Sequence, residues 1–341
     1  MVITHSRPRS LARNGLREID LQTDLRALAD LIDEAFADEL DAAGRASLRE
    51  MRTMAHMGPL LGLFMVGSDW GGLRGFVWEV DGRVVGCTTL QRADTYGRRW
   101  IIANVAVHPA HRGRGIARHL MEATLDRIRQ LGGEWAVLQV RPDNLPARHL
   151  YERLGFEDVF IETTLHHLPL PPLLPPVVPR GVEIRLLTDA DRAAVNFLIQ
   201  QATPDPARWW QTRRHREIDY GSDGPLVSAW GRLTGQGYRR RLGLFSAGEL
   251  VGMVDADVRP RRDHRLDLLV HPQARGQWET LLLALGVAEL KAYPQRGVTA
   301  TLYDYQPEAI AACEAAGFRP ILRLATMRKP IRSLSRSLSA E

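Results

Sequence analysis

The chain has 341 residues, of which 45% are apolar, 25% charged and 7% aromatic. At roughly 150 residues per domain this length predicts two domains, and the composition excludes a collagen-like, coiled-coil or wholly disordered chain. The net charge of +5 lies in the second half, because residues 1–168 hold 21 basic and 22 acidic side chains whereas residues 169–341 hold 24 and 18. Arginine supplies nearly all the basic residues throughout, so we interpret the excess as a compositional bias on a solvated surface; the weaker alternative is a surface of the second half that binds a nucleic acid or an acidic partner.

The two cysteines, Cys87 and Cys313, are too few for a disulfide framework, and neither lies in a motif that would bind zinc. The basic first residues are not followed by the apolar segment of a secretory signal. No apolar run approaches the length of about 18 residues that a membrane-spanning helix requires. We therefore expect a cytoplasmic protein with no membrane association and no metal site.

Hydrophobic periodicity predicts the elements of the first half. Leucines at three- and four-residue spacing between Leu21 and Phe36 indicate an amphipathic helix, and the turn Asp81-Gly82 joins two strands in a hairpin. The elements that follow alternate: strand Ile101–Val107, helix Gly115–Leu131, strand Trp135–Val140, helix Leu145–Leu154 and strand Phe156–Leu165. Interleaved strands and helices predict a mixed α/β sheet.

Six prolines occupy the eleven positions from Pro169 to Pro179. Because proline fixes φ and lacks an N–H, this stretch is predicted to be a stiff, extended spacer and the boundary between two domains.

The sequence repeats itself on the two sides of this spacer. The first half contains Val84-Val85-Gly86, Val107-His108-Pro109, Arg112-Gly113 and Gly155-Phe156, and the second contains Leu250-Val251-Gly252, Val270-His271-Pro272, Arg275-Gly276 and Gly317-Phe318. The offsets of 166, 163, 163 and 162 residues indicate a tandem duplication of one α/β module. We predict a first domain at 14–168, a proline-rich linker at 169–180, a second domain at 181–330 and a basic tail at 331–341.

The segment VAVHPAHRGRGIA, from Val105 to Ala117, places small residues between a predicted strand and a predicted helix. A helix N-terminus has unpaired N–H groups and a partial positive charge, so it binds anions when no side chain blocks their approach. Gly113, Gly115 and Ala117 leave that approach open. The segment suits a phosphate cradle, although a tightly packed strand-to-helix turn would use the same residue types.

A second segment, NLPARHLYERLGF, runs from Asn144 to Phe156. Asn144 and Tyr151 are seven residues apart, so on a helix they lie on nearly the same face. Gly155 then supplies a left-handed stop for that helix.

Together the two segments resemble the GNAT superfamily of acyl-CoA-dependent N-acyltransferases, with V-x-V-x-P-x-x-R-G-x-G-x-A and N-x-x-A-x-x-x-Y-x-x-x-G-F in the family's order. The resemblance covers about Arg99 to Phe160, whereas Leu16 to Arg98 fits the family's variable acceptor-binding portion only by pattern. It implies an α/β fold of two tandem GNAT-like modules, each a mixed, mostly antiparallel sheet flanked by helices, in a layout similar to that of mycothiol synthases.

The resemblance also implies acetyl-CoA as the acyl donor and a role for each matching residue. The main chains of Val105 and Val107 would pair with the pantetheine amides, and Asn144 would contact the pantetheine arm. The pyrophosphate would lie on Arg112, Gly113, Arg114, Gly115, Ile116 and Ala117. Tyr151 would lie beside the thioester sulfur and protonate the leaving thiolate as a general acid; the alternative is a half-buried helix aromatic whose hydroxyl contacts water.

The general base has no assignment from the sequence. Family members often carry a glutamate on the strand before the second motif, but the matching residue here is Gln139, which is not a useful proton acceptor. Glu79, Asp94, Glu134 or a chain of water molecules are the candidates.

The second copy differs at the positions that would hold the cofactor. Gly115, Ile116 and Ala117 correspond to Trp278, Glu279 and Thr280, and a carboxylate would repel a pyrophosphate while an indole fills its space. Asn144 and Tyr151 correspond to Gln306 and Cys313. We predict that this copy is a degenerate domain that has lost cofactor binding.

Other residues have weaker functional interpretations. His108 and His111 lack further ligands at metal spacing, and Cys87 is expected to be a buried apolar residue rather than an acyl-carrying nucleophile. Two larger sets could line an acceptor site, but the first is more typical of a charged helix face and the second of packing. They are the acidic Asp30, Asp33, Glu34, Asp38, Glu39 and Asp41, and the aromatic Trp209, Trp210, Tyr220 and Trp230.

The sequence thus predicts an acetyl-CoA-dependent N-acyltransferase that moves an acetyl group to a primary amine by direct transfer in a ternary complex, with its active site in the first module only. The acceptor, a small-molecule amine or a protein amino group, stays open, and so does the oligomeric state. The alternative is a non-catalytic acyl-CoA sensor or binding module, in which the missing base reflects lost chemistry.

Overall fold

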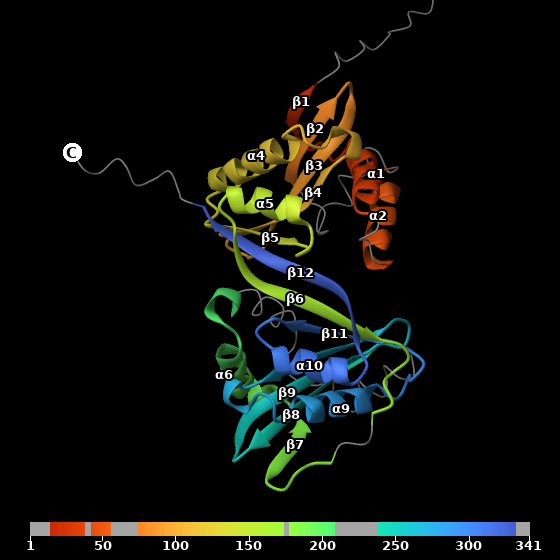
Figure 1. Ribbon diagram of the computed structural model, residues 1–341, viewed down its shortest axis with the longest axis vertical. Helices are drawn as coiled ribbons and strands as arrows, with labels where there is room; N and C mark the ends of the chain where they lie inside the picture. The colour runs from red at the N-terminus through yellow and green to blue at the C-terminus, as the bar shows by residue number, and fades with distance from the viewer. Residues whose placement is uncertain (1–13, 38–41, 56–73, 174–176, 209–236, 332–341) are drawn as a thin grey trace, which may run out of the picture. The chain divides into compact units, whose positions relative to one another are not determined.

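The computed structural model describes residues 14–37, 42–55, 74–173, 177–208 and 237–331 (Figure 1). Their contacts define two compact units. Unit 1 consists of the described residues of Met1–Gln139, Pro146–Glu157 and Met327–Glu341, and unit 2 of those of Val140–Leu145 and Asp158–Thr326.

The elements of unit 1 follow the predicted alternation. They are β1 (Gly15–Glu18), α1 (Leu25–Ala35), α2 (Ala42–Ala55), β2 (Arg74–Val80), β3 (Arg83–Arg92), β4 (Arg99–Val107), α4 (Ile116–Gln130), β5 (Trp135–Val140) and α5 (Leu145–Arg153). The strands lie in the order β1-β2-β3-β4-β5, antiparallel from β1 to β4 and parallel between β4 and β5. The sheet is therefore mixed and mostly antiparallel.

Helices cover both faces of this sheet (Figure 1). On one face, α1 and α2 pack against strand residues that include Val77 and Cys87. On the other face, Ile116 and Leu120 of α4 pack against Val85 of β3. Each large apolar side chain buried in this way contributes about 1.5–3 kcal/mol to folding, which fixes α4 and the loop before it against the sheet.

The elements of unit 2 are β6 (Glu157–His167), β7 (Val182–Leu186), α6 (Arg192–Ala202), β8 (Tyr238–Ser246), β9 (Glu249–Val258), β10 (His264–Val270), α9 (Glu279–Leu290), β11 (Val298–Tyr303), α10 (Pro307–Ala315) and β12 (Arg319–Pro330). From β7 to α10, the described elements of unit 2 follow the order of unit 1, without a described counterpart of α2. The strand order is β6-β11-β10-β9-β8-β7, with β10 and β11 parallel and the other neighbouring pairs antiparallel.

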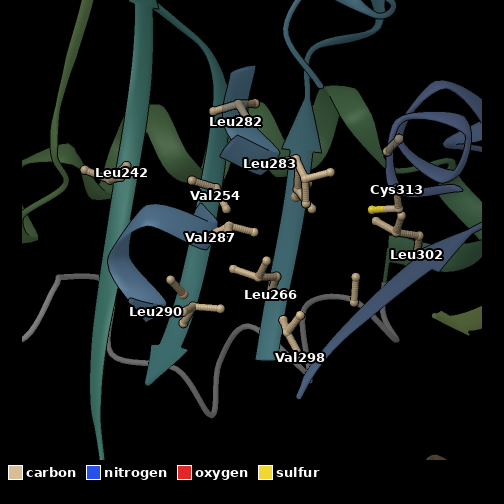
Figure 2. Close-up of a cluster of buried hydrophobic side chains, with 14 of the residues drawn as sticks. Leu242, Val254, Leu266, Leu282, Leu283, Val287, Leu290, Val298, Leu302 and Cys313 are labelled. Atoms are coloured by element: carbon tan, nitrogen blue, oxygen red, sulfur yellow. The ribbon is translucent and has the colours of Figure 1, made fainter. Parts of the chain in front are cut away.

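The main core of unit 2 lies between this sheet and the helices α9 and α10 (Figure 2). Its labelled side chains are Leu282, Leu283, Val287 and Leu290 of α9, Cys313 of α10, and Leu242, Val254, Leu266, Val298 and Leu302 of the strands. A second cluster on α6 packs against Phe245, Met253 and Leu269. The sheet of unit 2 is thus apolar on both sides.

Each half of the sequence gives its last strand to the other unit. β6 comes from the first half, but it pairs with β11 from His167↔Val298 to Glu162↔Tyr303, and its Leu165 lies in the core of unit 2. The end of β12 comes from the second half, but its residues from Met327 onward belong to unit 1, beside β5. There the N–H of Ile331 donates to the carbonyl of Glu134 at 2.8 Å.

Two side chains at the ends of the exchanged strands occupy matching places. In unit 1, Nζ of Lys329 donates to the carbonyl of Leu154, at the end of α5. In unit 2, the ring of His167 lies 5.6 Å from that of Phe318, at the end of α10. Lys329 and His167 are 162 residues apart, the same offset that relates Phe318 to Phe156. The exchange is therefore reciprocal.

The predicted fold class is confirmed in both units. The boundary between the compact units does not fall at residue 168 of the sequence, because the last strand of each half belongs wholly or partly to the other unit. The proline-rich stretch is also not a spacer throughout its described part. Leu170 is 9% exposed, packs in the core of unit 2, and its N–H donates to Pro294 at 3.2 Å. Within the described residues, no helix is both long and apolar enough to cross a membrane.

Candidate active site

Main-chain groups of β4 are open along the edge that faces β5. The parallel pairing of the two strands covers Arg99, Trp100 and Ile101 of β4 and ends before Val105. The N–H of His108 donates to Val85 of β3 at 2.9 Å. Because main-chain groups alternate along a strand, those of Val107 and Val105 point away from β3. This is the orientation that an added strand-like ligand requires.

One of these carbonyls already has a protein partner. Nε of Arg112 donates to the carbonyl of Val107 at 3.1 Å, so the side chain of Arg112 folds back along the loop. The predicted pairing of Val107 with pantetheine would therefore use its N–H. Among the described residues, the pairing of β4 with β5 does not include Val105, whose two main-chain groups lie on the side toward β5.

The loop into α4 has the geometry of an anion site. Gly113 and Gly115 both adopt the left-handed φ of 76°, and Gly115 is the N-cap residue of α4. Among the described residues no side chain caps this helix end, and the first turn holds no acidic residue. The N–H groups of the first turn have no acceptor within the helix, and the residues before it, Gly113 to Gly115, are exposed, so an anion can reach the positive helix end.

The side chains of this loop divide into two kinds. Arg112 and Arg114 are exposed and carry positive charge beside the helix end. Ile116 is 4% exposed and packs with Val85 and Leu120, so only its main-chain N–H is available to a ligand. Ala117 is half-buried. The predicted cradle is therefore main-chain N–H groups flanked by arginines.

Tyr151 lies on α5 and is 5% exposed, with its ring centroid 6.0 Å from that of Phe156. Burial raises the pKa of Tyr151 to about 12, so the hydroxyl keeps its proton at neutral pH. α5 is held at its end by the contact of Lys329 with Leu154. Asn144 immediately precedes α5 and groups with unit 2, whereas Tyr151 belongs to unit 1.

In unit 2 the helix end that matches the cradle is occupied by the protein itself. α9 begins at Glu279, and Oε2 of its carboxylate accepts a hydrogen bond from the N–H of Trp278 at 3.2 Å. Glu279 is 4% exposed. The carboxylate thus engages one N–H, that of the N-cap residue Trp278, and its position at the helix start would repel a phosphate approaching the same end.

The strand edge of unit 2 is occupied in the same way. β10 and β11 pair from His264↔Val298 to Leu266↔Ala300. Beyond the last of these pairs, the buried side-chain amide of Gln306 bridges the two strands. Its Nε2 donates to the carbonyl of Leu268 at 3.0 Å, and its Oε1 accepts from the N–H of Tyr303 at 3.2 Å. Leu268 is the counterpart of Val105, 163 residues later. Sequence comparison placed Gln306 opposite Asn144 but gave no indication of this bridge.

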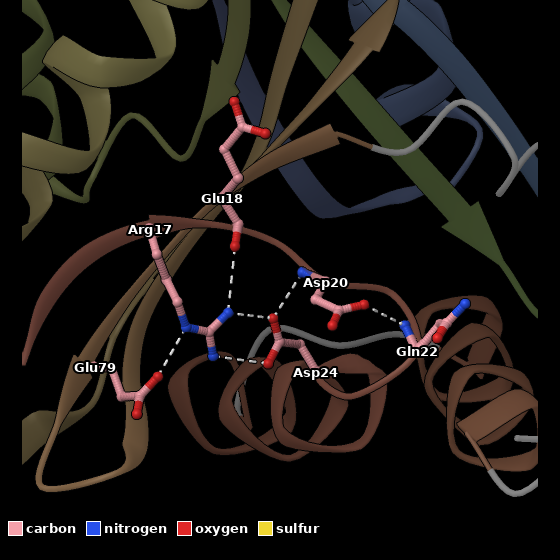
Figure 3. A network of polar contacts seen from close by, with 6 residues as sticks. All are labelled: Arg17, Glu18, Asp20, Gln22, Asp24 and Glu79. Carbon is pink, nitrogen blue, oxygen red and sulfur yellow. Dashed lines mark hydrogen bonds and ion pairs between the residues drawn. The ribbon is translucent and has the colours of Figure 1, made fainter. Parts of the chain in front are cut away.

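Each carboxylate considered as a general base is engaged elsewhere. Glu79 accepts from Nε of Arg17 at 2.7 Å (Figure 3). Oδ1 of Asp94 accepts from the N–H of Arg98 at 3.0 Å, and Glu134 lies 3.6 Å from the Arg98 side chain. Asp94 and Glu134 flank the start of β4, about 20 Å from Val105 at roughly 3.3 Å per strand residue. Gln139 is exposed near the end of β5, and the general base has no assignment.

The network around Arg17 is a structural clamp, because unit 2 repeats it. Arg17 donates to both oxygens of Asp24 at 2.6 and 2.9 Å, which ties β1 to the start of α1 (Figure 3). In unit 2, Arg185 of β7 donates to both oxygens of Asp191, before α6, at 2.9 and 2.7 Å. The hydrogen bonds from Arg185 lower the pKa of Asp191.

His108 also has a counterpart with the same role. Its Nδ1 accepts from the N–H of Ala110 at 3.2 Å, and Nδ1 of His271 accepts from the N–H of Gln273 at 3.4 Å. A feature present in both copies supports the turn rather than the chemistry. Nε2 of His108 also lies 3.3 Å from Glu34. Within the described residues, no group of three or more His, Cys, Asp or Glu side chains is placed to hold a metal ion.

The remaining residues with a predicted role lie in different environments. Cys87 is fully buried, and burial raises its pKa to about 12. Asp30 and Asp33 accept from Arg52 of α2 at 2.9 and 2.8 Å, which reduces the negative charge of that surface. Outside the described residues lie Asp38, Glu39, Asp41, Trp209, Trp210, Tyr220 and Trp230.

The fold of the whole chain is that of a tandem GNAT protein. The chain is similar to a solved tandem GNAT protein from the clavulanic acid biosynthesis pathway, with 20% identity, a TM-score of 0.53 and coverage of 93% of this chain and 99% of that one. Residues 33–156 match the model of the acetyltransferase (GNAT) family. This match covers the segment that contains both motifs, and the solved structure shows the likeness of the fold.

Two curated relatives extend the comparison. Streptothricin acetyltransferase of Streptomyces lavendulae is 34% identical over 86 residues, which are 25% of this chain and 45% of the relative. An N-alpha-acetyltransferase of Sulfurisphaera tokodaii is 33% identical over 94 residues, which are 25% of this chain and 56% of the relative. The chain spans about half the length of these relatives. The likeness to mycothiol synthases stays a prediction.

Proposed function

We propose that unit 1 is an N-acetyltransferase that moves the acetyl group of acetyl-CoA directly to a primary amine, and that unit 2 binds no acetyl-CoA. The contrast between the two copies carries this proposal. Unit 1 leaves the N-terminus of α4 uncapped among the described residues, and the pairing of β4 with β5 stops before Val105. Unit 2 instead places the buried carboxylate of Glu279 at the start of α9 and bridges its matching strand edge with Gln306.

Acetyl-CoA supplies a thioester carbonyl for the amine to attack. The C–N bond forms, the C–S bond breaks and the sulfur leaves as a thiolate. Tyr151 donates its hydroxyl proton to that sulfur, and its pKa of about 12 keeps the proton in place until then. We assign the proton lost by the amine to water, since Glu79, Asp94 and Glu134 are engaged in other contacts.

The acceptor class rests on chemistry that the relatives share. One is named for acetylation of streptothricin and the other for N-alpha-acetylation. Both names support an amine as the acceptor. The pairing of Asp30 and Asp33 with Arg52 gives no support to a strongly cationic amine over a singly charged one.

Calorimetric titration with acetyl-CoA tests the proposal. One site per chain is expected, and Gly115→Trp, which imports the residue of the second copy, is expected to abolish binding. Gly132→Trp is the matched control, because Gly132 follows the other end of α4 with a similar φ of 74° and a Cβ there would meet nothing within 4 Å, whereas a Cβ at Gly115 would make an ordinary contact with His119. Two sites, or unchanged binding by Gly115→Trp, would contradict the assignment.

A second measurement separates an enzyme from a binding module. Release of coenzyme A thiol is followed with a panel of small amines and peptides with unmodified N-termini. Turnover above background with at least one amine is expected. Tight binding of acetyl-CoA without turnover on any amine would favour the non-catalytic sensor.

A further inference from the structure

The strand β4 contains a bulge at the point where its main chain turns toward the open edge. Cys87 of β3 pairs with Ala106 and Thr89 pairs with Ala103, so two residues of β4, Asn104 and Val105, lie opposite Thr88. Asn104 adopts the left-handed φ of 52°. A bulge of this kind interrupts the ladder and redirects the residues around it.

A chain of side-chain hydrogen bonds holds the bulge. Nδ2 of Asn104 donates to Oγ1 of Thr89 at 3.0 Å, and that hydroxyl donates in turn to the carbonyl of Ala103 at 3.1 Å. The thiol of Cys87 donates to the carbonyl of Asn104 at 3.3 Å. Thr89 is 1% exposed and Cys87 is fully buried. Because the Thr89 hydroxyl and the Cys87 thiol belong to buried residues, these bonds hold the conformation of one strand segment.

The second copy has neither the bulge nor the residues that hold it. The pairing of β9 with β10 runs in one register from Arg265↔Asp257 to Val270↔Gly252. The counterparts of Asn104 and Thr89 are Asp267 and Asp255, two carboxylates that cannot donate to each other when ionised. The bulge thus occurs in the copy that leaves its β4 edge open and is missing from the copy that closes its edge with Gln306.

We propose that Asn104 and Thr89 are positioning residues, which hold the bulge of β4 so that the main chain of Val105 is presented to the pantetheine arm of acetyl-CoA. This inference rests on the proposed function. It assigns to these two side chains a role in binding one part of the ligand, separate from the diphosphate that the start of α4 would hold.

The test compares acetyl-CoA with 3′-phosphoadenosine 5′-diphosphate, which has the diphosphate but not the pantetheine arm. Thr89→Val removes the hydroxyl and keeps the side-chain shape. The variant is expected to bind acetyl-CoA about tenfold more weakly, the equivalent of one to two hydrogen bonds, and to bind the fragment as the parent protein does. A role in stability alone would not change the ratio of the two affinities.

Thr88→Val is the matched control. Thr88 is a fully buried neighbour on the same strand whose hydroxyl has no hydrogen-bond partner among the described residues. It is expected to leave both affinities unchanged. Thr89→Ser, which restores the hydroxyl, is expected to recover most of the affinity for acetyl-CoA. If Thr89→Val does not fold, Asn104→Asp, which imports the residue of the second copy, replaces it with the same expectation.

Three results would overturn the inference: an unchanged ratio of affinities in Thr89→Val, no recovery in Thr89→Ser, or an equal loss in Thr88→Val. Failure of the proposed function would give a different result, because the parent protein itself would then bind neither acetyl-CoA nor the fragment.

Discussion

The strand exchange predicts that each of two core substitutions destabilises the unit that is formed mainly by the other half of the sequence. Leu165 lies in the first half of the sequence but is fully buried in the core of unit 2. Met327 lies in the second half but is fully buried and belongs to unit 1. Leu165→Ala is therefore expected to destabilise unit 2, and Met327→Ala is expected to destabilise unit 1.

The magnitude follows from the burial of the two side chains. Truncation of a fully buried leucine or methionine to alanine costs about 2–5 kcal/mol, since a cavity remains. At about 1.4 kcal/mol per tenfold change, the equilibrium constant for opening the affected unit rises by roughly 30-fold to a few thousandfold. An effect of this size greatly exceeds the usual scatter of exchange measurements.

Hydrogen exchange followed by mass spectrometry under native conditions measures this effect segment by segment. In Leu165→Ala, faster exchange is expected first in α9, β10 and β11. In Met327→Ala it is expected first in β4, α4 and β5. Leu28→Ala is the matched control, because Leu28 is a fully buried leucine of the first half whose core belongs to unit 1. If Leu165→Ala and Leu28→Ala accelerated the same segments, the exchanged assignment of β6 would be wrong.

Three further predictions follow from the buried and paired groups. Tyr151→Phe should lower turnover by roughly 10²- to 10⁴-fold in steady-state assays while the Kd for acetyl-CoA changes little, and unchanged turnover would exclude the role of general acid. Hydrogen bonds from Arg185 lower the pKa of Asp191, so their contribution to stability is complete above the ordinary carboxyl pKa of 3.8 and is lost as the pH falls through the lower folded value. The free energy of unfolding in urea, measured between pH 7 and 3, should therefore depend less on pH in Asp191→Asn than in the parent protein. Burial raises the pKa of both Cys87 and Cys313 to about 12, so iodoacetamide at pH 8 should label neither thiol until the protein is unfolded, and rapid labelling of the folded protein would refute this.

Local patterns predicted the elements around the candidate site because each depends on residues close in sequence. The helix predicted at Gly115–Leu131 is α4, Ile116–Gln130, and the strand predicted at Ile101–Val107 is the main part of β4. The replacement of Ile116 by Glu279 also indicated a changed helix end, since a side chain at that position lies next to the N-terminal N–H groups. The roles of Tyr151 and Asn144 stay predictions.

The bulge and the Gln306 bridge were missed for a different reason. Both depend on contacts between strands, which periodicity along one segment does not report. One sequence feature points to the bulge: Asn104 interrupts the apolar run of β4, and asparagine is depleted in strands and tolerates a left-handed φ. No corresponding feature identifies Gln306, whose amide could equally have contacted solvent.

The exchange of the last strands could not be read from the sequence at all. After a duplication, the end of either half presents the same strand pattern to the same kind of sheet edge, so β6 and β12 each suit both units. Composition and periodicity are identical for the exchanged and unexchanged arrangements. The choice is made by which unit Leu165 and Met327 enter, and that is a property of the folded chain.

The exchange also sets an order for folding during protein synthesis. A nascent chain leaves the ribosome from its N-terminus, and domains usually fold as they emerge. For unit 1 this order is interrupted, because its sheet beside β5 is complete only after Met327–Ile331 has been translated. The elements that would bind acetyl-CoA are therefore translated early, but the sheet that holds them is completed only when nearly the whole chain has emerged, and a product that ends before Met327 would lack a complete unit 1.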